Sequence, residues 1–462
     1  MKINRTLVRG AAVLLATLAM MWPALYNRYP LLYPDSLTYI GDGHLVARAI
    51  FLHRLSDYYG IRSFIYSLGI LPWHWNITLW PVVVFQSLIT AWLVWLVVRS
   101  ILKRNMLALY LALTLILTIL TSVGWFVCLI MPDILAPALC LSTYLLIFAN
   151  DTLSRIERTA VMLITWWAIA SHASHLILAV WMSLALALVL FLQRQPIRRS
   201  LKTIAPLFWI VMAAAIAQLT LHAYLYGTPT LNGDRPPFLM ARIIADGPGK
   251  TYLQQHCANL DWAICDSVNN LPDNEDDFFW AENGVWQTAD PTAQHRILQE
   301  EMPLVLATLR TYPRQQIAKS TSNFWQQLTT YYLGAFDGSD YITEDIGNIL
   351  PGARTAYLNT RQAKDALPTE AFSTIQQWTV ITSLFVIVAF TTFTWRRSPR
   401  LAGLTVVIIC TVIPNAFITG VLSGIDDRYQ SRVIWLLPFL AGMFIIHYLE
   451  HRRSPTPSQE AQ

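Results

Sequence analysis

Carboxylate and imidazole side chains that could transfer a proton recur in the short polar segments between the hydrophobic runs of this chain. Asp35 stands in YPDSLTY, shortly after the first hydrophobic run, and Asp133 stands in IMPDILAP at the start of a later one. His172 and His175 in ASHASH lie between two further runs. Such a group can act as a general base when it is held within hydrogen-bond reach of a hydroxyl group. These four residues are the first candidates for a chemical site.

Cationic and aromatic side chains that could bind an anion occur in similar polar segments. Arginine fits phosphate with two parallel hydrogen bonds, and a Gly-Pro-Gly turn before a helix, as in DGPGKT, can bind an anion at the helix start. The candidate phosphate- or substrate-binding residues are Arg48, His53, Arg54, Arg62, His172, His175, Lys250, Asp427, Arg428, Tyr429 and Arg432.

Each candidate also has a purely structural interpretation. Asp35 and Asp133 could cap helices, since Pro-Asp-Ser is a common helix start. The two histidines could anchor the chain at a membrane surface, and the arginines could extend to lipid headgroups. Lys250 could belong to a plain turn and helix start. The sequence leaves both interpretations open.

The composition predicts that these segments are positioned by membrane-spanning helices. Hydrophobic residues make up 55% of the 462 residues and charged residues 13%, against about 25% charged in soluble domains. The apolar residues form blocks of the roughly 17–25 residues that cross a bilayer as a helix. We therefore predict an all-α polytopic membrane protein with about ten spans. The expected spans are 10–27, 77–98, 106–126, 133–150, 159–173, 175–193, 203–225, 374–394, 402–422 and 433–449.

The placement of Lys and Arg predicts the orientation of these spans. Basic residues concentrate in the short connectors on one side, as in RSILKRN near Arg99 and RRSPR near Arg397. Because short cytoplasmic loops carry an excess of Lys and Arg, both termini are expected in the cytoplasm. The first hydrophobic run has no clear signal-peptidase site and is expected to remain as a helix. The Asp35 segment then faces outward.

Four parts of the chain are expected. Residues 1–225 form a seven-span module whose first outer loop, 28–76, contains an interfacial helix with Tyr and Trp residues suited to the headgroup layer. Residues 226–373 form a mainly helical outer domain, 374–450 three further spans, and 451–462 a cytoplasmic tail.

The outer domain contains two segments with helical periodicity and two cysteines. PTAQHRILQEEMPLVLATLRTYP is amphipathic, and RQQIAKSTSNFWQQLTTYYLGAF is expected to form a second helix. Cys257 and Cys265 lie on the face where disulfides persist, and their spacing permits a bridge without demanding one.

The layout of residues 1–225 resembles the GT-C superfamily of integral-membrane glycosyltransferases, which use polyprenyl-phosphate-linked sugars. The shared features are a cytoplasmic N-terminus, a long first outer loop with an early Asp (YPDSLTYIGDG to GIRSFIYSLGILP), a short second outer loop with an Asp, and a large outer segment late in the chain. The resemblance implies that Asp35 is the base or metal-associated residue and Asp133 the second acidic residue. Asp35 is followed by Ser36, not by a second acidic residue, so a divalent cation is left open and no other cofactor is implied.

The resemblance implies transfer of a sugar from a polyprenyl-phosphate carrier to a lipid or glycan acceptor on the outer face of the bacterial inner membrane. Partners would be that carrier, the acceptor and membrane lipids, and no nucleic acid is expected. FLMARIIADGPG and DDRYQSRVIWLLP are also similar to uncharacterised bacterial polytopic membrane proteins.

Three alternatives remain. They are a transporter or flippase for a lipid-linked or anionic substrate, a non-catalytic envelope assembly protein, and a transferase of acyl or phospho groups. The last would depend on His172 and His175 more than on Asp35.

Overall fold

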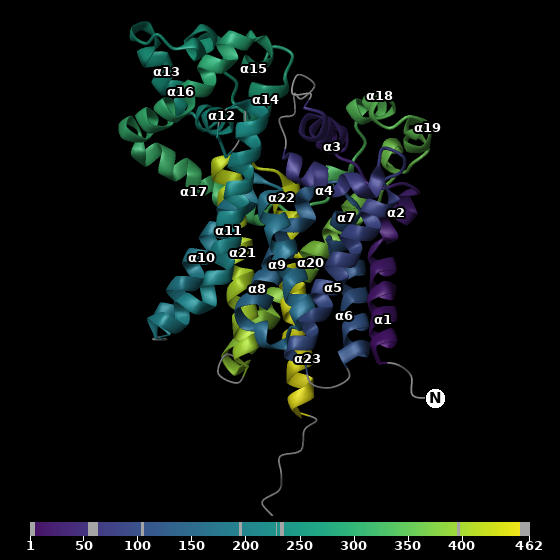
Figure 1. The fold of residues 1–462 in the computed structure, drawn as a ribbon. Helices are drawn as coiled ribbons and strands as arrows, with labels where there is room; N and C mark the ends of the chain where they lie inside the picture. The colour runs from purple at the N-terminus through teal and green to yellow at the C-terminus, as the bar shows by residue number, and fades with distance from the viewer. Residues whose placement is uncertain are drawn as a thin grey trace, which may run out of the picture. The chain divides into compact units, whose positions relative to one another are not determined.

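The structure, a computed structural model, describes residues 5–53, 63–102, 106–193, 196–227, 229–231, 235–394 and 398–452. These residues are mostly helical and contain no β-strand, which confirms the all-α prediction. They divide into two compact units (Figure 1). The large unit takes the described residues of Met1–Leu231, Tyr331–Val412 and Ser431–Gln462, and the small unit those of Asn232–Thr330 and Ile413–Gln430.

The helices that belong wholly to the large unit come from both ends of the chain. They are α1 (Arg5–Met20), α2 (Trp22–Asn27), α3 (Pro34–Leu52), α4 (Phe64–His74), α5 (Trp80–Ile101), α6 (Met106–Leu120), α7 (Val123–Cys128), η2 (Pro132–Ile134), α8 (Leu135–Phe148), η3 (Asn150–Thr152), α9 (Arg155–Ala170), α10 (Ala173–Leu192), α11 (Ile197–Tyr226), η6 (Gly334–Phe336), α18 (Asp340–Ile349), α19 (Ala353–Leu358), η7 (Gln362–Lys364), α20 (Thr369–Thr394) and α23 (Leu436–Arg452).

The small unit is built mainly from one continuous stretch of chain. Its helices are α12 (Phe238–Ala245), α13 (Pro248–His256), η4 (Cys257–Asn259), η5 (Ala263–Asn270), α14 (Glu275–Trp280), α15 (Val285–Thr288), α16 (Pro291–Thr311) and α17 (Pro313–Thr329). Two more helices, α21 (Pro399–Leu422) and α22 (Asp427–Ile434), have residues in both units. Of the expected outer domain, 226–373, residues 232–330 therefore belong to the small unit, and 226–231 and 331–373 to the large unit.

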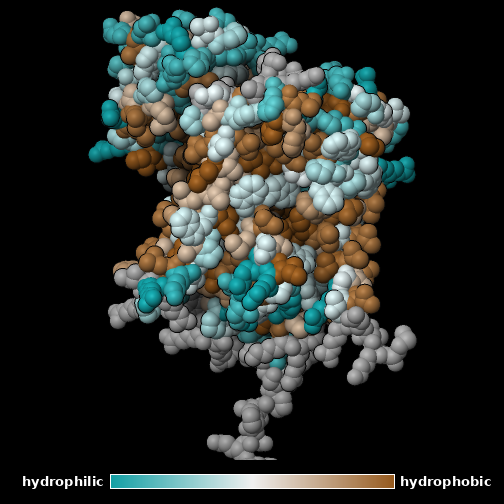
Figure 2. All heavy atoms as spheres, in the orientation of Figure 1, coloured by the Kyte–Doolittle hydropathy of each residue, from teal (hydrophilic) through white to brown (hydrophobic). Residues whose placement is uncertain are grey.

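Six helical stretches among the described residues are long and apolar enough to cross a membrane. They are Trp80–Ile101, Ala173–Leu192, Ser200–Leu225, Thr369–Thr391, Pro399–Leu422 and Asp427–Glu450. Long apolar helices in this number are typical of a membrane protein. Figure 2 shows hydrophobic side chains gathered over the middle of the long helices of the large unit.

The other four expected spans overlap shorter helices. α1, α6, α8 and α9 have 14 to 16 residues each, fewer than the roughly 20 that a perpendicular span needs. The expected span 10–27 is divided between α1 and α2, where Pro23 lies in the first turn of α2 and lacks the N–H that would continue the helix. The expected span 106–126 is similarly divided between α6 and α7.

The small unit has its own hydrophobic core. Met240, Leu253, Phe278 and Leu304 are among the buried residues that α12, α13, α14 and α16 contribute to it. Buried Glu300 on α16 accepts hydrogen bonds from the backbone N–H groups of η5 residues Ala263 (2.7 Å) and Ile264 (3.1 Å). Cys257 and Cys265 are joined by a disulfide in the structure.

Candidate functional site

The candidate site of the large unit is organised by an isolated parallel bridge between Leu31 and Leu129. The N–H of Leu31 donates to the carbonyl of Cys128 (3.0 Å), and the N–H of Ile130 donates to the carbonyl of Leu31 (3.1 Å). Asp35 and Asp133 each follow a bridged residue by four positions. Because the two paired segments are parallel, Asp35 and Asp133 both lie beyond the same end of the bridge. The fold thus brings the two acidic segments together.

Two buried glutamine side chains hold the bridged segments. Gln86 of α5 donates to the carbonyls of Val127 (3.1 Å) and Leu129 (2.9 Å), and its amide oxygen accepts from the hydroxyl of Tyr66 (2.8 Å). Gln362 of η7 bonds both backbone groups of Leu32, at 3.1 Å and 2.6 Å. Buried backbone groups need such partners when no sheet supplies them. The two amides therefore fix the path of the chain before Asp35 and Asp133.

Asp133 lies in η2 and forms a buried ion pair with Arg432 of α22. The two side chains are only 3% and 2% exposed, and the N–O distance is 3.4 Å. The Arg432 guanidinium also reaches the hydroxyl of Ser174 (3.4 Å), which lies 2.8 Å from Nδ1 of His172. Asp133 and His172, both selected from the sequence, are thus linked through Arg432 and Ser174.

His175, in the first turn of α10, lies beside this ion pair. It is fully buried, and it interacts electrostatically with Arg432 and Asp133. Its Nδ1 lies 2.9 Å from the carbonyl oxygen of Ala168. A carbonyl only accepts, so Nδ1 carries the proton and Nε2 of the neutral ring is an acceptor. Among the described residues Nε2 has no hydrogen-bond partner.

Aromatic side chains of α3 and α9 pack against Tyr66 of α4. Its ring meets Tyr39 edge-on (5.1 Å between centroids) and stacks on Trp167 (6.0 Å). Burial raises the pKa of Tyr66 well above its usual value, and Tyr39 and Asp133 raise it further. Tyr66 therefore stays a neutral donor.

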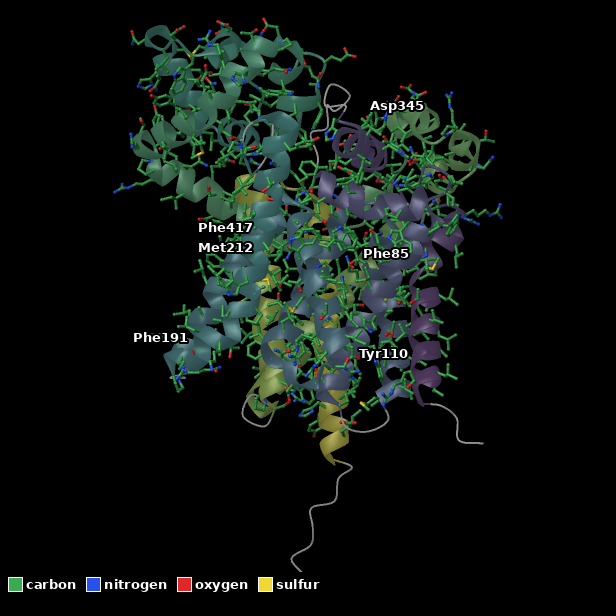
Figure 3. The ribbon with its side chains drawn as sticks, viewed as in Figure 1. Phe85, Tyr110, Phe191, Met212, Asp345 and Phe417 are labelled. Carbon is green, nitrogen blue, oxygen red and sulfur yellow. A yellow bond between two sulfur atoms is a disulfide. The ribbon has the colours of Figure 1, made fainter. Side chains whose placement is uncertain are left out.

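Gly69 allows Trp167 to approach, because a Cβ there would lie 2.4 Å from the indole nitrogen. Phe85, labelled in Figure 3, also contacts Trp167 (5.7 Å).

Asp35 lies in the first turn of α3 and is partly exposed. Ser36 closes this helix start, since its hydroxyl accepts from the N–H of Tyr33 (2.9 Å). α3 packs against α4 and α18. On α18, burial raises the pKa of Tyr341, and the carboxylates of Asp345 and Asp35 raise it further. Asp35 is therefore close enough to α18 to act on that phenol.

The remaining residues selected from the sequence lie elsewhere. Lys250 in the small unit donates to the carbonyl of Leu271 (2.8 Å) and pairs with Asp273 (2.7 Å). Asp427, Arg428 and Tyr429 also belong to the small unit, and the Arg428 guanidinium lies 5.0 Å from the Tyr429 ring centroid. The predicted binding residues Arg54 and Arg62 lie outside the described residues.

Among the described residues, no group of three or more His, Cys, Asp or Glu side chains could hold a metal ion.

Gln86, Tyr66 and Ser174 are site residues that the sequence does not predict, and the pairing of Arg432 with Asp133 is not predicted either. Gln86 had a signal, because an amide inside the apolar run WPVVVFQSLITAW needs a partner. Tyr66 and Ser174 lie among other aromatic and polar residues of their segments, and nothing local distinguishes them.

His74 at the end of α4 makes the stability of the large unit depend on pH. It is buried, and the N–H of Asn76 donates to its Nδ1 (3.0 Å). Burial, with His44 nearby, lowers its pKa to about 4, whereas an unfolded His titrates near 6.5. Between these values the unfolded state binds more protons, so stability falls as the pH falls.

We expect the unfolding temperature of the purified protein to drop between pH 6.5 and 4, and to drop less in His74→Gln. A thermal scan at half-unit pH steps measures both slopes. His295→Gln, at an exposed position, is the control and should follow the wild type. Equal slopes for His74→Gln and the wild type would remove His74 as the cause.

Comparison with protein-family models, with curated proteins and with solved structures gives no match to this chain.

Proposed function

We propose that the chain spans a bacterial inner membrane ten times, with both termini in the cytoplasm. We further propose that it transfers a sugar from a polyprenyl-phosphate carrier to a lipid or glycan acceptor on the outer face. The observation that carries the proposal is the parallel bridge of Leu31 with Leu129, which brings together the Asp35 and Asp133 segments. The six long apolar helices support a membrane location, and the basic connectors support the orientation.

Asp35 is the proposed general base. The acceptor hydroxyl oxygen forms a bond to the anomeric carbon of the sugar and passes its proton to the Asp35 carboxylate. The bond from the anomeric carbon to the carrier phosphate breaks, and the carrier leaves with the electron pair. Asp35 suits this role better than Asp133, because it is partly exposed at a helix start whereas Asp133 is buried in an ion pair.

Arg432 is proposed to stabilise the negative charge that builds on the leaving phosphate through its electrostatic field, since its side chain is buried in the pair with Asp133. Preorganised charges in a site that excludes water are the strongest source of such stabilisation. Asp133 and Ser174 contact its guanidinium from two sides and would hold it in place. Asp133 is thus a positioning residue in this proposal. A divalent cation at Asp35 would add to the same stabilisation.

His175 favours a second candidate function, the transfer of a phospho or acyl group. Its buried Nε2 is an acceptor beside Arg432 and Asp133. A neutral imidazole in this state can remove the proton of an attacking hydroxyl, and Arg432 could then stabilise the anionic transition state. In this case His175 would be the base and Asp35 would be dispensable.

Complementation separates the two candidates. A strain without this gene receives the wild type, Asp35→Asn, His175→Gln or Asp345→Asn, and its envelope glycans and lipid-linked sugars are compared by mass spectrometry. Asp345 is the matched control, a carboxylate on α18 (Figure 3).

The proposal predicts that Asp35→Asn, at normal protein level, leaves the glycan without one sugar and the loaded carrier accumulating. Loss of a general base lowers the rate by about 10²–10⁴-fold. Asp345→Asn should restore the glycan. Full restoration by Asp35→Asn together with failure of His175→Gln would replace the first candidate by the second. Restoration by both variants would reject both.

A further inference from the structure

Helix α17 of the small unit has an inverted distribution of side chains. Its buried residues are all polar: Gln316, Asn323 and Gln327. Its large apolar residues Ile317 and Trp325 are 62% and 58% exposed. A surface helix of a soluble domain normally shows the opposite pattern.

The buried polar face of α17 is fixed by hydrogen bonds inside the small unit. Gln316 and Asn323 donate to the carboxylate of Asp246 at 2.7 Å and 2.8 Å. Gln327 donates to the carbonyl of Asp426 (2.8 Å) and accepts from the N–H of the same residue (3.0 Å). The helix therefore cannot rotate to bury its apolar side without breaking these bonds.

The outer surface of α17 divides into two stripes. Ile317, Phe324 and Leu328 follow helical spacing on one stripe, and Phe324 and Leu328 are partly buried. Trp325 lies beside this stripe, beyond the exposed residues Thr321 and Arg314. The second stripe is exposed and polar, and it consists of Gln315, Lys319, Ser322 and Gln326. α17 thus presents one face to the protein, one apolar face and one hydrophilic face.

The apolar stripe adjoins the end of a candidate membrane span. Within the small unit, α17 lies closely against the last turns of α21, where a Cβ on Gly420 would lie 2.7 Å from the Cβ of Gln327. The ring of Phe324 contacts that of Phe417 (6.4 Å), which is labelled in Figure 3. On this part of α21, Phe417 and Ile413 are 49% and 46% exposed. Lipid that covers these residues reaches the apolar stripe of α17 as well.

We propose that α17 lies in the interfacial layer of the bilayer, with the stripe of Ile317, Phe324 and Leu328, and Trp325 beside it, in contact with phospholipid and the stripe of Lys319 and Gln326 in water. A Trp at the edge of an apolar face suits this layer, since its ring is apolar and its N–H is polar. Helices with one apolar and one polar exposed face bind membrane surfaces in this orientation. The proposal is independent of the reaction that the protein catalyses.

Site-directed spin labelling of the full chain in phospholipid nanodiscs tests this. A single cysteine replaces Ile317, Trp325, Lys319 or Gln326, one at a time. The background carries Cys410→Ala, because Cys410 is a partly exposed free cysteine whereas Cys128 and Cys140 are buried. Collision rates of each nitroxide are measured with oxygen, which concentrates in lipid, and with a water-soluble nickel chelate.

We expect labels at 317 and 325 to collide more with oxygen than with nickel, and labels at 319 and 326 to show the reverse. All four labelled positions lie on α17, so they share its mobility. If the nickel chelate reaches the labels at 317 and 325 as readily as those at 319 and 326, the stripe lies in water and the proposal is rejected. Protection of 317 and 325 from both reagents would show a protein partner on the stripe and reject it equally.

Discussion

Replacing Arg432 with methionine is expected to lower the free energy of unfolding by about 3–5 kcal/mol, the cost of breaking a buried ion pair from one side. The methionine fills similar volume but leaves the Asp133 carboxylate, 3% exposed, without its cationic partner. The carboxylate then has to stay charged in a site that excludes water or take up a proton. Unfolding in mixed micelles, followed by tryptophan fluorescence as the denaturing detergent is increased, measures the loss.

Two controls isolate the ion pair as the cause. Adding Asp133→Leu to Arg432→Met removes both charges and should recover most of the stability, since apolar replacements of buried pairs are often neutral. Breaking the exposed pair of Arg400 and Asp151, with side chains 39% and 70% exposed, through Arg400→Met should cost less than about 1 kcal/mol. A similar cost for Arg432→Met and Arg400→Met would contradict the prediction.

The second large effect is expected for Asp246→Ala in the small unit, again with a loss of about 3–5 kcal/mol. The Asp246 carboxylate is buried and accepts from Arg242 (2.8 Å and 3.1 Å), Gln316 (2.7 Å) and Asn323 (2.8 Å). Alanine removes an acceptor from the side chains of Arg242, Gln316 and Asn323, all of them buried. Among the described residues, Arg242 then keeps its pair with Glu275 (2.9 Å). These bonds tie the end of α12 to α17.

Limited proteolysis of the full chain, with thermal unfolding of the same samples, measures this effect. Asp246→Ala should make the small unit susceptible to cleavage at temperatures where the wild type resists. Asp273→Ala is the control, because Asp273 also pairs with a cation, Lys250, but its side chain is 92% exposed. If Asp246→Ala resists cleavage as well as Asp273→Ala does, the network does not hold the unit together.

The helical, apolar character of the chain was predictable, because it depends on local composition. Every expected span overlaps a helix of the structure. The breaks after α1 and α6 were not predicted, because hydropathy averaged over a window does not register one proline or one bend. Length and hydropathy alone support six of the expected ten spans.

The candidate site was predictable only as a set of segments. Asp133 and His172 were selected because polar groups near a bilayer are costly and mark sites. The partner of Asp133 is Arg432, 299 residues further along the chain, and no local pattern specifies so distant a contact. The motif ADGPGK was interpreted as a turn or an anion site near Lys250. In the structure Gly247 does turn the chain, with φ of 100°. The neighbouring Asp246 accepts hydrogen bonds from Arg242, Gln316 and Asn323.

The hydrogen bonds of Gln362 have a consequence for the synthesis of the protein. Gln362 bonds Leu32, 330 positions earlier, and its N–H donates to the side chain of Asn27. Chains emerge from the ribosome at about 5–20 residues per second, so the segment before Asp35 waits tens of seconds for its partner. Until residue 362 has left the ribosome, the segment before Asp35 lacks these hydrogen bonds. The segment before Asp35 is therefore completed only after more than three quarters of the chain has been synthesised.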